Sequence, residues 1–404
     1  MTEFKKLTNL TSCYELENFK PITINTKMLD NLGIDYPIPK DVGSALEEGS
    51  EWYRNLFENR LLNPATNYNL VLTDPEQELE IHNYTGICPT NVLEVSPIEG
   101  SCSVGCQYCL VTDGKHLKKT DVFSNYREKL ASSLQRNRHR NTFYYFSPKT
   151  EAFSEPLLYS GVAHEIVKCF IEHFERYPDS CIRIFIATKA GLKHLEFKHE
   201  GTSVIELISR IASKVQVNGS IGIMPTYIRN ILEPNAAGID DRLAVLEKLR
   251  SLGVESESVL CQPLFLPYLD RDSVNMFIKK LAAAGIKNIK PEFFTADIRN
   301  IVLVSQYINH FDPGKLGEFL YPYLMEGNLN HIKQRSRLAP DRKTCVAKLR
   351  MIDEIASENG ISISICNWVK RELGSVDKWV NQIDGSSSAK GYRCLGYQTA
   401  LFRQ

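Results

Sequence analysis

Residues 91–110, NVLEVSPIEGSCSVGCQYCL, join an apolar stretch of β-strand character to a loop that holds three cysteines. Cys102, Cys106 and Cys109 stand at the spacing C-x3-C-x2-C. Thiolates are soft ligands that bind zinc, copper(I) or iron–sulfur clusters. A structural zinc site takes four ligands, usually as two pairs, and His116 is the only candidate close by. The spacing therefore favours an iron–sulfur cluster.

A 4Fe–4S cluster normally takes four thiolates, so three cysteines would leave one iron without a protein ligand. A substrate or cofactor can bind at that iron. The alternative interpretation is three unrelated buried cysteines, because free cysteine is among the most frequently buried residue types. It has to place all three within eight residues, in a loop that also contains Gly100 and Gly105.

Strand and helix patterns alternate from about residue 91 to residue 294. The predicted strands cover residues 91–95, 141–146, 181–187, 217–223, 258–266 and 286–294, with helices over 160–177, 204–215, 239–252 and 273–284. Such alternation indicates parallel βαβ units and an α/β fold. We expect a partial (β/α)6 TIM-like barrel. The active sites of barrels lie at the C-terminal ends of the strands, so the cysteine loop would lie at the mouth.

Three regions are predicted along the chain. Residues 1–84 form an N-terminal accessory region with an amphipathic helix near residues 43–62. Residues 85–300 form the barrel. Beyond residue 297 the alternation weakens, and residues 301–404 are expected to form a C-terminal cap that closes the open side of the barrel.

The overall composition is that of an ordinary globular protein. The 404 residues include 48 basic and 48 acidic side chains, and this balance argues mildly against a nucleic-acid partner. Eleven cysteines without a secretory signal predict reduced thiols and a cytoplasmic location. No apolar run reaches the length of a membrane span, so no membrane partner is expected.

The cysteine spacing, with Tyr108 as the aromatic residue directly before the third cysteine, resembles the radical S-adenosylmethionine superfamily. Residues 231–253, ILEPNAAGIDDRLAVLEKLRSLG, resemble the glutamate–proline, arginine–leucine and glycine signature of its spore photoproduct lyase-like branch. That branch also ends its third strand in threonine–lysine, here Thr188-Lys189. The resemblance covers about residues 92–294. It implies a 4Fe–4S cluster whose open iron chelates S-adenosylmethionine, and an external electron donor of the flavodoxin or ferredoxin type.

In this superfamily the loop after the second strand binds the amino group of the methionine. The equivalent loop here is residues 147–156, SPKTEAFSEP, so the resemblance implies that Ser147, Glu151 and Glu155 bind the cofactor. An ammonium group needs acceptors, and a carboxylate supplies a charge-assisted one. The alternative is a loop that leads into a helix, with Glu155 near its N-terminus, where negative charge is favoured in any case.

Four further residues follow from the same resemblance. Lys189 would pair with the methionine carboxylate, as a compact point charge suited to an anion. The alternative is a solvated lysine, the common state of that residue. Ser220 would contact the ribose, and Glu233 with Arg242 would form a pair that is structural or contacts the cofactor. A helix-anchoring ion pair is the plain alternative for the last two.

One departure from the family pattern concerns the hydrogen donor. The photoproduct lyases proper are expected to carry a donor cysteine in the loop after the second strand, and residues 147–156 contain none. The candidates are Cys366, which ends a predicted strand over residues 361–366, and Cys394 in the tail. Either can instead be packed in a core, the usual place of a single cysteine. DNA repair is therefore not favoured.

The expected protein is an enzyme that cleaves S-adenosylmethionine and abstracts hydrogen from a small polar substrate, such as a sugar or nucleoside intermediate of specialised metabolism. The cofactor carries the chemistry, and the protein orients it and excludes water. Two alternatives stay open. One is the same chemistry on a macromolecule, either a DNA photoproduct or a peptide. The other is a non-catalytic iron–sulfur or zinc protein.

Overall fold

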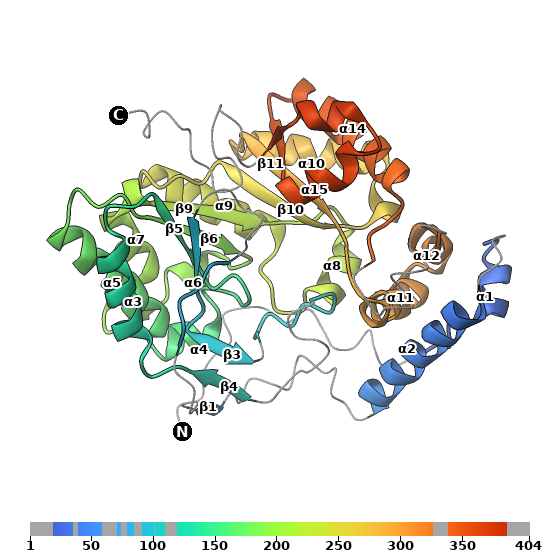
Figure 1. Cartoon of the computed structure of the whole chain (residues 1–404), viewed down its shortest axis with the longest axis horizontal. Helices are drawn as coiled ribbons and strands as arrows, with labels where there is room; N and C mark the ends of the chain where they lie inside the picture. Colours follow the sequence, from blue (N-terminus) through green and yellow to red (C-terminus); the bar gives the residue numbers. More distant parts are fainter. Residues whose placement is uncertain are drawn as a thin grey trace.

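The centre of the molecule is a sheet of eight strands, seen in Figure 1. A computed structural model describes residues 19–34, 39–58, 71–73, 79–84, 91–100, 102–109, 119–325 and 338–385. The strand order is β13-β12-β11-β10-β9-β6-β5-β2, and every neighbouring pair is parallel. The fold is therefore α/β, as the alternating sequence pattern predicts. The eight strands are β2 (Asn91–Val95), β5 (Thr142–Phe146), β6 (Arg183–Thr188), β9 (Val215–Ser220), β10 (Ser258–Leu264), β11 (Asn288–Phe293), β12 (Ser362–Ile365) and β13 (Asp384–Gly385).

Helices connect the strands, and most of them bury one face of the sheet. They are α3 (Tyr126–Asn137), α4 (Glu155–Tyr159), α5 (Val162–Arg176), α6 (Leu192–Leu195), α7 (Val204–Arg210), α8 (Thr226–Leu232), α9 (Ile239–Ser251), α10 (Arg271–Ala283), α14 (Arg342–Glu358) and α15 (Asn367–Gly374). Short strands β1 (Val71–Thr73), β3 (Ile98–Gly100) and β4 (Lys119–Val122) form a small second sheet, and β7 (Lys198–His199) pairs with β8 (Thr202–Ser203).

Local signals in the sequence fix several of these boundaries. The hydroxyl of Ser203 accepts a hydrogen bond from the backbone N–H of Glu206, whose carboxylate accepts from Ser203 in return, so a capping box starts α7. Helices α9 and α10 end before Gly253 and Gly285, whose φ angles of 81° and 73° are left-handed. The two helix ends predicted at these glycines are confirmed.

The two faces of the sheet differ in what covers them. On β6, Ile184 and Ile186 lie in the large core beneath the helices, whereas Phe185 belongs to a small cluster on the opposite face. The same alternation holds on β5, where Tyr144 faces the helices and Phe143 the opposite side. Every second side chain along these strands therefore points away from the helices, toward the opposite face of the sheet.

The alternation of strand and helix continues beyond residue 297, where we expected it to weaken. Helix α11 (Ile298–Phe311) starts at Asp297, whose carboxylate accepts a hydrogen bond from the N–H of Asn300 at 2.9 Å. It is followed by α12 (Leu316–Leu324) and α14, and then β12 pairs in parallel with β11. The strand predicted over residues 361–366 thus extends the central sheet.

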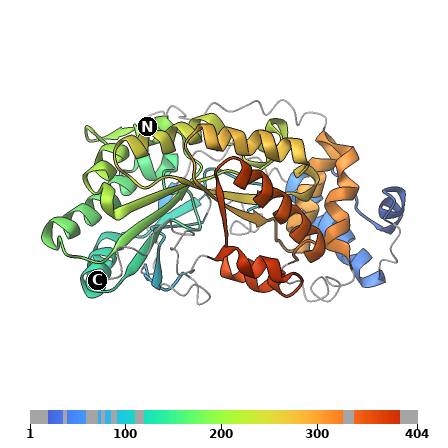
Figure 2. The same cartoon turned by 90° about the horizontal axis from the view of Figure 1, so that it is seen from above.

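The N-terminal helices pack at one end of the molecule. Helix α1 (Thr26–Asn31) is followed by α2 (Lys40–Glu58), which lies along α11. Figure 2 shows these blue helices beside the orange α11 and α12, away from the green helices at the opposite end. Their apolar residues form a second core that also includes Tyr108 of the cysteine loop. The boundaries proposed near residues 84 and 300 stay predictions.

None of the described helices combines the length and the apolar character that crossing a membrane requires.

Candidate functional site

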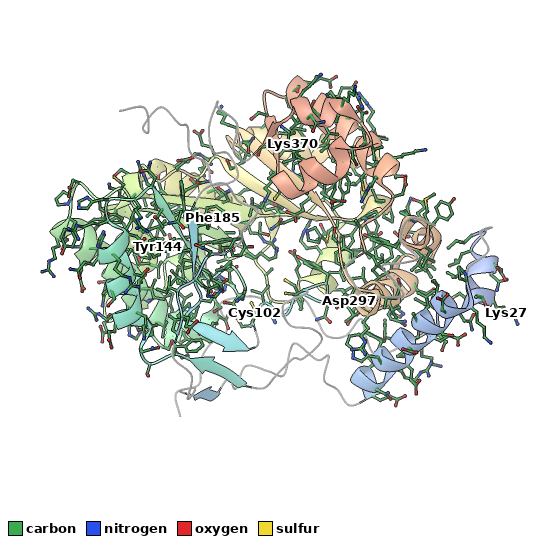
Figure 3. All side chains as sticks on the ribbon, viewed as in Figure 1. Lys27, Cys102, Tyr144, Phe185, Asp297 and Lys370 are labelled. Atoms are coloured by element: carbon green, nitrogen blue, oxygen red, sulfur yellow. The ribbon has the colours of Figure 1, made fainter. Side chains whose placement is uncertain are left out.

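The cysteine loop follows β3 at the carboxyl end of β2, and Figure 3 labels Cys102 at the lower side of the central sheet. Two tight turns shape the loop. The N–H of Gly105 donates to the carbonyl of Cys102 at 3.1 Å, and the N–H of Cys109 to that of Cys106 at 3.1 Å. Gly105 has a φ of 64°, a left-handed conformation that favours glycine. The three cysteines are half-buried thiols outside any disulfide.

Burial dominates the protonation of two of these thiols, those of Cys102 and Cys106. It raises the pKa of Cys102 to about 12, and the nearby Cys109 and Glu151 raise it further. It also raises the pKa of Cys106, which the ammonium of Lys189 lowers in part. The thiols at positions 102 and 106 therefore stay protonated at neutral pH when no metal is bound. Metal binding would release their protons.

A buried ionic cluster lies beside this loop, and Glu233 is its centre. The carboxylate oxygen Oε1 of Glu233 accepts a hydrogen bond from the hydroxyl of Tyr108 and lies 3.3 Å from the ammonium of Lys189. The other oxygen, Oε2, pairs with Nη2 of Arg242 at 2.5 Å. Lys189 also donates to the hydroxyl of Ser220 at 2.6 Å. Five of the residues predicted for the site thus meet in one place.

Glu233 pairs with two cations. The side chain of Glu233 is fully buried, and that of Lys189 is 14% exposed. Burial alone would raise the pKa of Glu233, but Arg242 and Lys189 outweigh it and hold that pKa below its usual range. The carboxylate of Glu151 also interacts with Lys189, and the guanidinium of Arg229 with Glu233. The low exposure of Lys189 also contradicts the solvated-lysine interpretation.

Arg242 ties the cluster to the backbone. Its Nε donates to the carbonyl of Ala237 at 2.6 Å, and its Nη1 to the carbonyl of Ser220 at 2.7 Å. The neighbouring Asp241 has a separate role, because its carboxylate accepts from the N–H of Leu192 at 3.1 Å. A Cβ at Gly191 would lie 1.8 Å from that carboxylate, so the contact depends on the glycine.

Glu151 accepts hydrogen bonds from neighbouring segments of the chain, which the sequence did not predict. Its Oε1 accepts from the hydroxyl of Thr188 at 2.6 Å and from the N–H of Phe153 at 3.2 Å. Its Oε2 accepts from the N–H of Lys189 at 2.7 Å. Burial raises the pKa of this carboxyl, and these hydrogen bonds lower it in part. Glu151 therefore fastens the loop after β5 to the end of β6, beside the cysteines.

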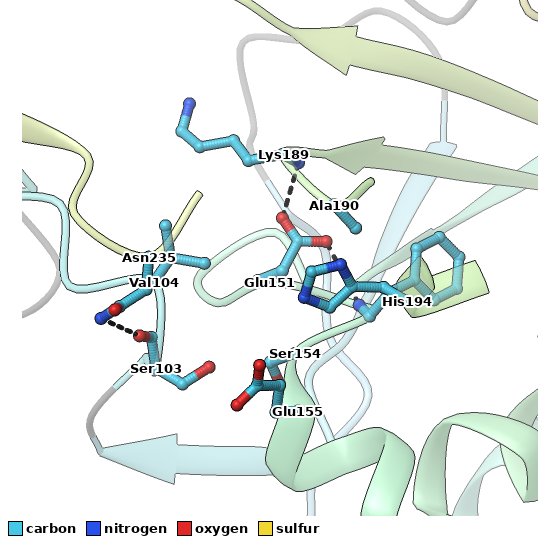
Figure 4. A pocket seen from close by; sticks show the side chains of 10 residues that line it. Ser103, Val104, Glu151, Ser154, Glu155, Lys189, Ala190, His194 and Asn235 are labelled. Carbon is cyan, nitrogen blue, oxygen red and sulfur yellow. Dashed lines mark hydrogen bonds between the residues drawn. The ribbon is translucent and has the colours of Figure 1, made fainter. Parts of the chain in front are cut away.

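A small pocket opens between the cysteine loop and this carboxylate, as Figure 4 shows. Asn235 is bonded to the cysteine loop, since its Nδ2 donates to the carbonyl of Ser103 at 2.9 Å and its backbone N–H to that of Val104 at 3.3 Å. The Oδ1 of Asn235 and the hydroxyl of Ser154 are buried and have no hydrogen-bond partner among the described residues. Glu155 lines the same pocket as the first residue of α4. Its position agrees with both interpretations given for it.

Asn235 and His194 are among the lining residues of this pocket that were not predicted. Asn235 stands two positions after Glu233 in the block that carries the resemblance, so its place in the sequence was the available signal. His194 is buried in α6, and burial lowers its pKa to about 4, so its ring is neutral at neutral pH. No pattern near His194 marks it as a site residue.

Ser147 and Cys366 were also predicted for the site. The hydroxyl of Ser147 shares a hydrogen bond with that of Thr150 at 2.5 Å, and Ser147 has a left-handed φ of 56°. Cys366 follows β12, and three strands separate β12 from β6. Four strand spacings amount to roughly 19 Å in a flat sheet, which the curvature of a barrel would shorten. Cys394 lies outside the described residues.

The three thiols of the cysteine loop are soft donors, which could bind zinc or an iron–sulfur cluster. Among the described residues, no three cysteine, histidine, aspartate or glutamate side chains gather closely enough to hold one ion. Thiolate ligands of one zinc ion all lie about 2.3 Å from it. A four-iron cluster offers each thiolate a different iron, so its cysteines stand farther apart.

No protein-family model matches the chain, and no curated protein matches its sequence. Fold and site together define an α/β protein that places three thiols and a buried ionic cluster at the carboxyl edge of a parallel sheet.

Proposed function

We propose that this protein is a radical S-adenosylmethionine enzyme in which Cys102, Cys106 and Cys109 hold a 4Fe–4S cluster. The observation that carries the proposal is the ionic cluster centred on Glu233. It brings the ammonium of Lys189 close to the thiol of Cys106, in the loop that carries all three cysteines. Thiolates suit the iron, and a buried cation suits the carboxylate of an amino-acid cofactor.

Cys102, Cys106 and Cys109 would hold the cluster, which when bound would supply the one-electron reduction of S-adenosylmethionine that makes hydrogen abstraction from a substrate possible. The chain supplies orientation and shielding. Lys189 would pair with the methionine carboxylate. Glu233 and Ser220 hold the ammonium of Lys189 in position. Glu151 keeps the end of β6 in place through the backbone N–H of Lys189. An external flavodoxin or ferredoxin would supply the electron.

The finer fold in this proposal is a partial TIM-like barrel whose inner face holds the substrate. Strand register supports the arrangement, because Leu260 pairs with Ser220 on one side and with Lys290 on the other. The Nζ of Lys290 lies 3.7 Å from the carboxylate of Glu292. Polar side chains of β11 therefore lie near the same level of the sheet as Lys189 and Ser220. We propose a small polar substrate there, such as a sugar or nucleoside, in a cytoplasmic enzyme.

The test is the cleavage of S-adenosylmethionine by the anaerobically reconstituted protein with dithionite as reductant. We expect 5′-deoxyadenosine and methionine in equal amounts, detected by mass spectrometry. Lys189→Met serves as the matched variant, because it removes the cation and leaves the three thiols in place. Absence of 5′-deoxyadenosine from a protein that carries a full complement of iron would contradict the proposal.

A further inference from the structure

Gln107, which lies between Cys106 and Cys109 in the sequence, connects the cysteine loop to other parts of the protein by hydrogen bonds. Gln107 is 3% exposed. Its backbone N–H donates to the carbonyl of Leu232 at 2.8 Å, and its Nε2 donates to the carbonyl of Gly105 at 2.8 Å. Its Oε1 accepts a hydrogen bond from the hydroxyl of Tyr307 at 3.0 Å. The side-chain amide is thus bonded through both its oxygen and its nitrogen.

The partner of Gln107 comes from a distant part of the chain. Tyr307 lies on α11, 200 residues further on, and is buried in the second core. Its ring packs against that of Tyr53 on α2, with centroids 6.2 Å apart and planes at 87°. It also contacts the ring of Phe19 at 5.6 Å. The N-terminal segment therefore packs on the residue that reaches the cysteine loop.

We propose that α11, supported by the N-terminal segment, braces the cysteine loop through the Tyr307–Gln107 hydrogen bond, and that this brace sets how firmly the thiols are held for the cluster. Tyr307 and Gln107 are positioning residues, since they act through the loop. Only the statement about the cluster rests on the proposed function. The order of the cysteine loop can be measured on the protein without metal.

Removal of the tyrosine hydroxyl would leave Oε1 of Gln107 buried without its donor. Such a loss weakens the closed loop by the contribution of one buried hydrogen bond, so the loop should open about three- to tenfold more often. Thiol alkylation measures this opening directly. Cys106 and Cys109 flank Gln107 in the sequence, so their alkylation by iodoacetamide should accelerate most.

The experiment compares Tyr307→Phe with Tyr323→Phe in the metal-free full chain. Tyr323 is a matched control, because it is buried in the same core and donates one hydrogen bond to the carbonyl of Phe294 at 2.7 Å, without contacting the cysteine loop. We expect three- to tenfold faster alkylation in Tyr307→Phe and an unchanged rate in Tyr323→Phe. Equal alkylation rates in Tyr307→Phe and Tyr323→Phe would contradict the proposed role of the Tyr307–Gln107 hydrogen bond.

A second comparison uses Gln107→Met, which removes the side-chain amide and both of its hydrogen bonds while Tyr307 stays in place. It should also accelerate alkylation, and it tests the proposal where Tyr307→Phe does not fold. Where both single variants fold, the double variant should alkylate no faster than Gln107→Met alone. Additive effects would contradict the proposal. In the reconstituted protein, Tyr307→Phe should lose iron to a chelator faster and alter the electron paramagnetic resonance spectrum. A wild-type protein without iron would refute the proposed function and leave the alkylation test of the brace intact.

Discussion

Replacing Arg242 by methionine tests the centre of the ionic cluster. The guanidinium donates to two carbonyls and pairs with Oε2 of Glu233, whereas the contacts of Tyr108 and Lys189 are with Oε1. The variant therefore leaves Oε2 of a fully buried carboxylate without its partner. Removal of one member of a buried ion pair costs about 3–5 kcal/mol, and we expect that loss in the free energy of unfolding.

Urea unfolding of the metal-free protein, followed by circular dichroism under reducing conditions, measures this loss from the shift in midpoint at a constant slope. Lys189→Met is the matched control. Its ammonium is partly exposed and Glu233 would keep Arg242, so a smaller loss of about 1–2 kcal/mol is expected.

The effect should depend on pH in a defined direction. The pKa of Glu233 lies below its ordinary value of 4.5 in the folded protein. Its ion pairs therefore stabilise the fold fully above about pH 4.5, and this contribution decreases as the pH falls below that value. The difference between wild type and Arg242→Met should be smaller at pH 3 than at pH 7. A loss below about 1 kcal/mol at pH 7, or an equal loss at both pH values, would refute this reasoning.

Three further outcomes are expected. Lys189→Met should weaken S-adenosylmethionine binding about tenfold to a hundredfold in equilibrium dialysis, with unchanged iron content, and unaltered binding would remove Lys189 from the site. Because burial lowers the pKa of His194 from 6.5 to about 4, its contribution to stability should be present above pH 6.5 and lost toward pH 4. His194→Gln should therefore flatten the stability curve in that range, and an unchanged curve would contradict the assignment. If Cys366 or Cys394 returns hydrogen to a substrate radical, its alanine variant should still form 5′-deoxyadenosine but lose or divert the product, and normal product from both variants would exclude both cysteines.

The core of the fold follows from local sequence patterns. Runs such as residues 141–146, rich in aromatic residues, and the glycine stops at 253 and 285 predict strands and helices that the structure contains. Strand limits were less predictable. Residues 221–223 continue the apolar run of β9, but they lie beyond its end. There a Cβ at Gly222 would come within 2.5 Å of the carbonyl of Pro263, a contact that no local pattern reveals.

Helix α11 was missed in the sequence for a different reason. Its residues 301–304, IVLV, have β-branched character, and the alternating pattern seemed to end there. Burial against α2 and the cap at Asp297 instead stabilise a helix. Such packing between segments far apart in the chain overrides local propensity.

The candidate site was predictable where strand ends carry its residues. The ends of parallel strands meet at one edge, which is why Lys189 and Ser220 come together. The contacts made over long separations were not predictable. Asn235 reaches Ser103 across 132 residues and Tyr307 reaches Gln107 across 200, and nothing in the sequence pairs them. Sequence patterns also did not reveal that protein donors contact both oxygens of Glu151, and its predicted contact with the cofactor stays a prediction.

The most direct measurement of the central claim is the iron and acid-labile sulfide content of the chain after anaerobic reconstitution. The proposal predicts about four of each per chain in the wild type. Cys106→Ala should lose the cluster and its absorbance while the chain stays folded. Cys169→Ala, which replaces a buried cysteine of α5 far from the loop in sequence, should keep the full content. Zinc in place of iron, or an unchanged iron content in Cys106→Ala, would contradict the claim.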